Sequence, residues 1–476
     1  MLKKQLMRNL ILSFGGDVFV KFIGFVIVIA IARLLGDTAL GQYSFVVTLT
    51  WIIFKIAELG LDMVIRKEMS RDKEKASQDF FSQALALRFF ASFLAAIVTI
   101  AFVYGTHRNQ TIIHLTYLTA IGMIFFNVSM IFRSAFYALQ KMHYEVIVKV
   151  ISNLAFLLGI VFMFLGFGLT VVIIFLLIRY VLSFVLSYLL FRKKISKVFK
   201  LKISLKNWNG LIKESYFFWI ITALSMIYFR IDIIILSLMK NEAIVGWYTA
   251  GYRIIDMISL IPVTITSVLF PVMAELFVKD KEKLSKLYKI AFRYLLILAL
   301  AMILGVGILS QQIIHLLYGK GFENAAIVLK VLIWAQGLMF ISFLLINLLG
   351  AINKQRVVVI TSATALALNV VLNFILIPKY SFLGAGWATL LAEIVNCIFL
   401  LFFVIKYFEK PEIKSTFSIL LIFGSVYTLF LLSQMNPWIN AMLGVLIFGT
   451  ILMFLKIIKK EDVALFFNSI KLRKNM

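Results

Sequence analysis

The chain has 476 residues, of which 62% are apolar and 15% are charged. Soluble domains are about half apolar and about a quarter charged, so this composition excludes a soluble globular protein and predicts an all-α polytopic membrane protein. Lys and Arg number 48 against 22 Asp and Glu, and the single cysteine, Cys397, excludes a disulfide framework or a cysteine-rich metal site.

Long apolar runs follow one another along the whole sequence. A helix needs about 20 mostly apolar residues to cross a hydrocarbon core about 30 Å thick. The runs are continuous and rich in Leu, Ile and Phe, which is typical of spanning helices and not of the alternating strands of a β-barrel. About fourteen transmembrane helices are predicted, at 9–34, 40–62, 80–104, 111–137, 145–165, 168–191, 212–238, 243–275, 290–309, 324–350, 357–377, 383–405, 414–432 and 438–455.

The basic residues of the loops predict the orientation. With a cytoplasmic N-terminus, the inner segments hold 32 Lys and Arg, whereas the outer loops hold four, namely Arg108, Lys240, Lys320 and Lys379. Cytoplasmic loops of membrane proteins carry such an excess, so we expect a multi-pass protein of the cytoplasmic (inner) membrane with both termini in the cytoplasm. The net charge of +26 then needs no nucleic-acid partner to explain it.

The loops are too short for a soluble domain. The longest lies between Arg192 and Lys213, and no GxxxxGK[ST] phosphate loop occurs. We therefore expect function within the bilayer, without an ATPase of its own and without a cofactor. The four histidines lack metal-ligand spacing, so no metal site is expected. The outer loops carry no cluster of catalytic groups, which favours a transporter over an enzyme such as a polysaccharide polymerase.

An internal repeat divides the sequence. Four short segments recur in the same order at offsets of 205, 208, 213 and 218 residues, which predicts two six-helix lobes of the same orientation. A parallel repeat of this kind suits a transporter that rocks about a site between its lobes. The predicted parts are an N-lobe at 1–206 with its basic loop, a C-lobe at 207–409, and two further helices with a basic tail at 410–476. The paired segments are 41–43 with 246–248, 72–75 with 280–283, 138–141 with 351–354, and 165–168 with 383–386.

Helix-end motifs resemble one known family. The residues that carry the resemblance are ARLLG at 32–36, GQY at 41–43, RID at 230–232, LS at 236–237, GWYTA at 246–250, Arg253, Pro262, FP at 270–271, HLLYG at 315–319, LGAG at 383–386 and Glu393. The sequence resembles the polysaccharide biosynthesis (Wzx-like oligosaccharide flippase) family of the multidrug/oligosaccharidyl-lipid/polysaccharide (MOP) exporter superfamily. The resemblance implies a MOP/MATE-like fold and a flippase for a polyprenyl-(pyro)phosphate-linked oligosaccharide, used in surface polysaccharide assembly.

Twelve basic residues fall within the predicted spans. A charge at a helix centre costs about 2.5–3.5 kcal/mol on insertion scales, so it faces a wet cavity or reaches a helix end. Snorkelling is predicted for the six within about two turns of an end, which are Arg33, Arg133, Lys149, Lys213, Arg293 and Lys330. Five deeper residues are predicted to bind an anionic substrate in a cavity between the lobes, namely Lys21, Lys55, Arg88, Arg230 and Arg253.

Acidic residues accompany these cations. Helical spacings of three or four place Asp17 with Lys21, Glu58 with Lys55, and Asp256 with Arg253 on shared faces, whereas Asp232 needs a partner elsewhere. Asp17, Glu58, Asp232 and Asp256 are thus predicted charge partners, and candidates for coupling to a proton or Na⁺ gradient. Self-neutralised pairs that only assist membrane insertion are the alternative.

Three further residues are singled out, and two of them have more than one interpretation. Arg179 and Glu393 lie near the middle of their spans, where either a strut within a lobe or a place in the cavity fits. Pro262 is predicted to kink its span and to act as a hinge, because proline removes a backbone hydrogen bond.

The expected protein is a monomer that acts on a lipid-linked glycan within membrane lipid. Two other functions within the same superfamily stay open, a multidrug cation antiporter and a peptidoglycan-precursor (lipid II) flippase. The excess of deep basic residues favours anionic cargo over an organic cation. Membrane potential and consumption of product outside are further candidate driving forces.

Overall fold

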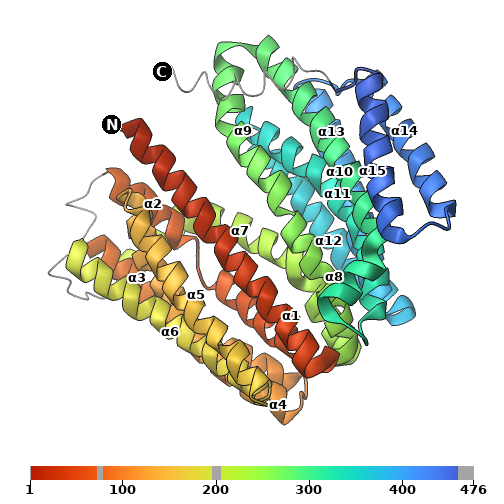
Figure 1. Cartoon of the computed structure of the whole chain (residues 1–476). Coiled ribbons are helices and arrows are strands. Elements are labelled where there is room, and N and C mark those ends of the chain that lie inside the picture. The colour runs from red at the N-terminus through yellow and green to blue at the C-terminus, as the bar shows by residue number, and fades with distance from the viewer. Residues whose placement is uncertain (1, 72–78, 196–204, 459–476) are drawn as a thin grey trace. The chain divides into compact units, whose positions relative to one another are not determined.

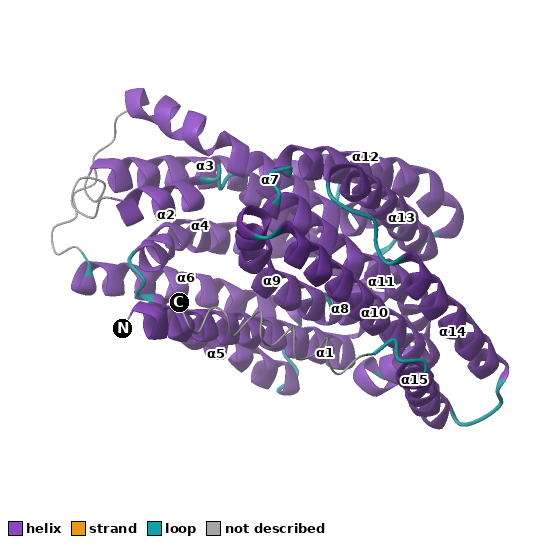
Figure 2. Ribbon diagram, turned by 90° about the horizontal axis from the view of Figure 1, so that it is seen from above, coloured by secondary structure: helices purple, strands orange, loops and turns teal. Residues whose placement is uncertain are grey.

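Apolar segments of this length fold as helices because lipid offers no hydrogen-bond partners, so each backbone amide must bond within its own segment. The computed structural model describes residues 2–71, 79–195 and 205–458. Figure 2 shows helices joined by short loops, and the described residues form no strand. The prediction of an all-α membrane fold is confirmed. The predicted basic segments at 196–204 and 459–476 lie outside the described residues.

The chain divides into two compact units, Met1–Gly246 and Trp247–Met476. Figure 1 labels their helices. The first unit holds α1 (Leu2–Ile56), α2 (Leu61–Arg71), α3 (Asp79–Gly105), α4 (Gln110–Ala138), α5 (Met142–Phe164), α6 (Leu169–Lys194) and α7 (Leu205–Met239). The division falls within α8 (Glu242–Ile258). The second unit holds α9 (Leu260–Lys279), α10 (Lys281–Tyr318), α11 (Glu323–Ala351), α12 (Gln355–Tyr380), α13 (Phe382–Tyr407), α14 (Ile413–Leu432) and α15 (Pro437–Phe454). The lobe boundaries inferred from the repeat stay a prediction.

Thirteen segments among the described residues are long and apolar enough to cross a membrane. One of them, Leu12–Ile56, has 45 residues and would be about 68 Å long as a straight helix, about twice the hydrocarbon thickness. It contains both of the first two predicted spans. Counting it as two gives the fourteen spans that the sequence predicts.

Gly36 separates the two halves of α1. Its backbone angles, φ 84° and ψ −177°, interrupt the helical geometry. Only glycine adopts this region without strain, because a Cβ would clash with the backbone. Nothing lies within 4 Å of the position of a Cβ at Gly36, so the backbone conformation and not crowding requires glycine.

The predicted span at 243–275 consists of two helices, α8 and α9. The interruption is at Ser259, three residues before Pro262. Pro262 lies in the first turn of α9, where a helix has no carbonyl to accept a hydrogen bond from that position. Its lack of an N–H is therefore tolerated there, and the role of Pro262 as a hinge stays a prediction.

Each unit has its own apolar core. In the first unit, Phe81 stacks on Phe191 with ring centroids 4.7 Å apart, and the ring of Phe132 lies tilted against both. In the second, Tyr288 and Leu344 are buried within the core formed by α9, α10, α11 and α13. Large apolar side chains such as Phe89 remain about half exposed on α3, which suits a surface that faces lipid rather than water.

The second unit contains the longest uninterrupted helix, α10, with 38 residues. It packs against α11 and α15. Near its N-terminal end, Ser285 and Lys289 both donate hydrogen bonds to Glu409, which lies in the linker between α13 and α14. Arg293, one turn further, forms an ion pair with Glu412 at 3.5 Å.

Candidate functional site

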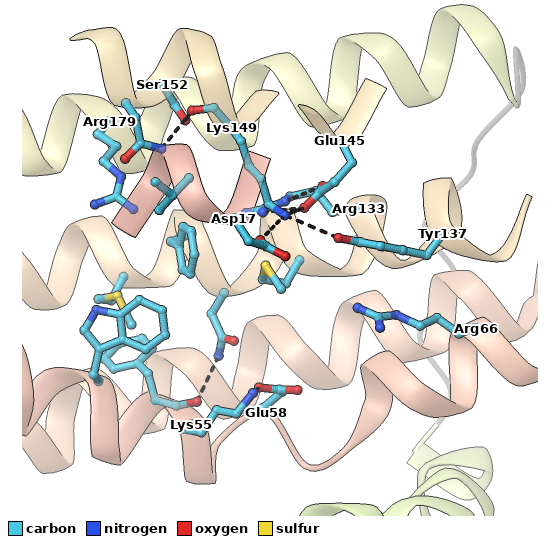
Figure 3. Close-up of a pocket in the computed structure, with 18 residues that line it drawn as sticks. Asp17, Lys55, Glu58, Arg66, Arg133, Tyr137, Glu145, Lys149, Ser152 and Arg179 are labelled. Atoms are coloured by element: carbon cyan, nitrogen blue, oxygen red, sulfur yellow. Dashed lines mark hydrogen bonds and ion pairs between the residues drawn. The ribbon is translucent and has the colours of Figure 1, made fainter. Parts of the chain in front are cut away.

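A cavity of about 330 Å³ lies within the first unit (Figure 3). Its wall is built from α1, α2, α4, α5 and α6 and from the turn between α1 and α2. The lining residues are Asp17, Val20, Trp51, Phe54, Lys55, Glu58, Arg66, Met123, Phe126, Asn127, Met130, Arg133, Tyr137, Glu145, Lys149, Ser152, Asn153 and Arg179. The lining includes five basic and three acidic side chains, so the cavity carries an excess of positive charge.

The most buried charges of the cavity form a three-residue network. Arg133 of α4 binds Glu145 of α5 with two hydrogen bonds, from Nε at 2.7 Å and from Nη2 at 2.6 Å. Lys149, one turn further along α5, lies 3.1 Å from the same carboxylate. All three side chains are nine-tenths buried or more. Because a buried charge needs close opposite charge and hydrogen bonds, this network fixes α4 against α5.

Asp17 of α1 joins this network from its exposed side. Its Oδ1 accepts a hydrogen bond from Lys149 Nζ at 2.7 Å, and Lys149 Nζ also lies 3.3 Å from the hydroxyl of Tyr137. The Asp17 side chain is 58% exposed, whereas that of Lys149 is 9% exposed. The structure therefore gives Asp17 a partner on another helix, which the spacing of Asp17 and Lys21 could not predict.

The predicted pair of Lys55 and Glu58 is present. Lys55 Nζ donates a hydrogen bond to Glu58 Oε2 across one turn of helix. Both residues line the cavity, at the end of α1 and in the turn that follows it. This is the one predicted pair that the structure places in the cavity wall.

Two arginines of the cavity have aromatic neighbours instead of carboxylates. The Arg66 guanidinium lies 4.3 Å from the ring centroid of Tyr137, and that of Arg179 lies 5.4 Å from Phe156 and 5.5 Å from Tyr180. Neither arginine makes an ion pair with a described residue. Figure 3 shows them at opposite sides of the cavity. Such arginines keep their charge available for an anion.

Arg88 lies in the packed interior behind the cavity. Its side chain is fully buried, Nη2 lies 2.5 Å from Asp62 Oδ1, and Nη1 donates to Asn127 Oδ1 at 2.9 Å. Asn127 in turn donates to Ser92 at 2.8 Å and lines the cavity. This placement favours a structural role for Arg88, as a support for the wall, over the substrate contact that its depth in the sequence predicts.

The remaining predicted residues lie outside this cavity. Lys21 is exposed on α1, and on α7 Arg230 is half-buried while Asp232 is buried. In α8, Arg253 contacts Asp256 at 3.4 Å, as the spacing predicts, with both side chains about a quarter exposed. Their roles in substrate binding or ion coupling stay predictions.

Glu393 lies in the interior of the second unit. It is 1% exposed and accepts a hydrogen bond from Ser342 Oγ of α11 at 2.5 Å. Asn396, one turn further along α13, lies 3.4 Å from both of its carboxylate oxygens. Because these contacts join α11 to α13, they suit the strut interpretation of Glu393. Arg179, the other residue with two interpretations, lines the cavity of the first unit.

Sequence reasoning missed much of the cavity. The prediction that Arg133 and Lys149 snorkel is wrong, because both are buried and paired with Glu145. One signal was available, since Glu145 and Lys149 are four apart and share a face of α5. Arg66 and Tyr137 carried no such signal, because their contact joins separate helices.

Two family models match more than half of the chain. The model described as polysaccharide biosynthesis protein matches residues 6–277, and the model described as lipid II flippase MurJ matches residues 149–452. Two proteins of Haloferax volcanii are similar in sequence. Probable low-salt glycan biosynthesis flippase Agl15 is 24% identical over 53% of this chain and 54% of its own, so the chain spans about half of that relative. Probable flippase AglR is 23% identical over 83% of this chain and 82% of its own.

Solved structures share the fold. The lipid II flippase MurJ in an inward closed conformation superposes with a TM-score of 0.79 at 18% identity, covering 95% of this chain and all of that one. An inward-facing multidrug resistance MATE family transporter superposes with a TM-score of 0.65 at 15% identity, covering 81% of this chain and 94% of that one. The predicted MOP fold is thereby confirmed. The chain belongs to the polysaccharide biosynthesis protein family of flippases, within the MOP exporter superfamily.

Proposed function

We propose that the protein flips a polyprenyl-(pyro)phosphate-linked oligosaccharide from the inner to the outer leaflet of the cytoplasmic membrane, for surface polysaccharide assembly. The observation that carries the proposal is the cationic cavity within a membrane-spanning unit, lined by five basic and three acidic side chains. Such a transporter breaks no bond, so it works by alternating access and not as an enzyme. Its partners are the lipid-linked glycan and the surrounding lipid.

Electrostatics explains why such a cargo needs this cavity. A phosphate or pyrophosphate group cannot enter a hydrocarbon core about 30 Å thick without losing its hydration. Arg66 and Arg179 offer guanidinium groups that form no ion pair with a described carboxylate, and planar guanidinium matches phosphate oxygens in pairs. The head group gains these contacts inside the protein while the prenyl tail stays in lipid.

The related proteins support this class of cargo. Two relatives are named as probable flippases, one of them for glycan biosynthesis. A lipid II flippase is the second candidate, supported by the family model over residues 149–452 and by the structural similarity to MurJ. The positive cavity argues against the multidrug cation antiporter, because an organic cation would be repelled from it.

Translocation in proteoliposomes tests the proposal. Purified full-length protein is reconstituted with a fluorescent polyprenyl-diphosphate oligosaccharide, and arrival of the glycan in the opposite leaflet is followed by its accessibility to a membrane-impermeant quencher. Wild-type protein is expected to accelerate flipping, and the double variant Arg66→Gln/Arg179→Gln to abolish the acceleration. Lys279→Gln, on an exposed ion pair of α9, is the matched control for loss of positive charge.

The competing cargoes give distinct outcomes. Faster flipping of lipid II than of other polyprenyl-linked glycans would identify the protein as a lipid II flippase. Transport of an organic cation with no glycan flipping would overturn the proposal.

Imposed proton and Na⁺ gradients in the same vesicles test the coupling that we propose for Asp17, Glu58, Asp232 and Asp256. Labelling of terminal tags in intact cells tests the proposed cytoplasmic termini, and mass measurement in detergent tests the proposed monomer.

A further inference from the structure

The three carboxylates of the cavity are held in different ways. Glu145 is 1% exposed and is fixed by two side chains, and Glu58 is held by Lys55 one turn away in the chain. Asp17 differs from both, because it is 58% exposed and its hydrogen-bond donor, Lys149, lies 132 residues away on another helix. Of the three, Asp17 is therefore the carboxylate that can leave its partner with the least loss, since water already solvates it.

The Lys149 ammonium has three close oxygen neighbours while Asp17 is bound. An ammonium group has three N–H donors. Its three neighbours are Asp17 Oδ1 at 2.7 Å, Glu145 Oε1 at 3.1 Å and the Tyr137 hydroxyl at 3.3 Å. Because these three oxygens surround the ammonium, a further anion reaches Lys149 by replacing one of them. Of the two carboxylates, Glu145 is too deeply buried to withdraw, so the anion that can be replaced is Asp17.

We propose that Asp17 occupies the position of an anion on Lys149, and that the phosphate of the cargo displaces it. This inference rests on the proposed function and adds a competitor to the same cavity. The displaced carboxylate turns to water, and the N-terminal half of α1 loses its ionic contact with α5. Asp17 thereby selects cargo, because only an anion that binds better than a side-chain carboxylate replaces it, and it couples cargo binding to release of α1.

Binding of inorganic pyrophosphate to the purified full-length protein tests the competition. Asp17→Asn removes the competitor and is expected to tighten binding about two- to fivefold, the factor that corresponds to an exposed ion pair. Asp17→Glu is expected to restore wild-type affinity. Glu275→Gln removes the same charge from an exposed pair on α9 and is expected to leave affinity unchanged. In a Lys149→Gln background, Asp17→Asn is expected to give no tightening.

A cross-linking measurement tests the release of α1. A Cβ at Gly16 would lie 3.5 Å from Val146 Cγ2, so cysteines at these two positions are close enough to form a disulfide between α1 and α5. In a Cys397→Ser background, pyrophosphate is expected to slow cross-linking of this pair. The same addition to a protein that also carries Asp17→Asn is expected to change the rate little, because the ionic contact is already absent.

The outcomes separate this inference from the proposed function. If wild-type protein binds pyrophosphate but Asp17→Asn does not tighten binding beyond Glu275→Gln, the competition is overturned and the flippase proposal stands. Unchanged cross-linking on pyrophosphate addition overturns the release of α1. If wild-type protein and all variants fail to bind pyrophosphate and fail to flip the glycan, the proposed function itself is overturned.

Discussion

Gly41 lies so close to Glu242 that a Cβ added at Gly41 would be 1.8 Å from the Glu242 carbonyl oxygen. The contact is reciprocal, since a Cβ added at Gly246 would be 2.1 Å from the carbonyl oxygen of Asp37. Both glycines and both carbonyls are related by the same offset of 205 residues that the sequence repeat predicts. The start of α8 therefore packs backbone to backbone against the segment of α1 that follows Gly36.

Substitution of either glycine is expected to force these backbones apart. Gly41→Ala and Gly246→Ala should each lower the free energy of unfolding by about 1–3 kcal/mol, the usual cost of overpacking. The control is Gly24→Ala in α1, where nothing lies within 4 Å of the new Cβ. Thermal unfolding in detergent measures the difference. A variant at Gly41 as stable as the control would contradict the close approach.

A second prediction concerns the break in α1. Gly36→Ala should cost about 1–3 kcal/mol because alanine cannot adopt the observed backbone angles without strain. Gly15→Ala has equal space around its Cβ and no positive φ, so it should be neutral or stabilising. Both variants can be compared by thermal unfolding. Equal stability of the two would mean that Gly36 does not mark the turn between two spans.

A third prediction separates a structural from a binding role for Arg88. Arg88→Met should leave Asp62 buried without its cation and cost about 3–5 kcal/mol, whereas Arg88→Met/Asp62→Asn should recover much of the loss. The measurements are folded yield in detergent and pyrophosphate affinity of the folded protein. We expect the double variant to bind as wild type does. A double variant that folds normally but no longer binds pyrophosphate would instead support the prediction that Arg88 contacts the substrate.

The fourth prediction is a pH dependence outside the membrane. Hydrogen bonds from Lys289 and Ser285 hold the pKa of Glu409 below its ordinary value of 4.5. A lowered pKa stabilises the fold above the ordinary value, and this contribution is lost as pH falls through the folded pKa. Glu409 is about a third exposed, so the contribution is at most about 1 kcal/mol. Thermal unfolding of wild type and Glu409→Gln should therefore differ at neutral pH and converge below about pH 4. A difference in thermal stability between the two proteins that stays constant from neutral pH to below about pH 4 would contradict this role of Glu409.

The helices could be predicted from the sequence because each span depends on its own composition. The first two spans, at 9–34 and 40–62, follow from apolar length, and the structure breaks α1 between them at Gly36. The pair of Lys55 and Glu58 could also be predicted, because it lies within one helical turn. Composition and helical spacing along one segment are therefore enough to predict the spans and the contacts within a turn.

The cavity could not be predicted in the same way, because its contacts join helices that are distant in the chain. The hydrogen bond from Lys149 to Asp17 connects residues 132 apart, and the pair of Arg133 and Glu145 crosses between α4 and α5. Depth along a helix also misled the prediction. Arg133 and Lys149 lie near helix ends but face buried Glu145, whereas the deeper Arg88 is enclosed by Asp62 and Asn127.

The length of α10 has a mechanical consequence for the two last helices. Its 38 residues extend about 57 Å, so about half of the helix projects beyond a hydrocarbon core about 30 Å thick. Ser285 and Lys289 bind the linker before α14 to α10 near its N-terminal end, and α15 packs directly on α10. With attachments at two levels, α14 and α15 are expected to tilt with α10 as one rigid body, so any lateral opening toward lipid on that flank needs α10 itself to move.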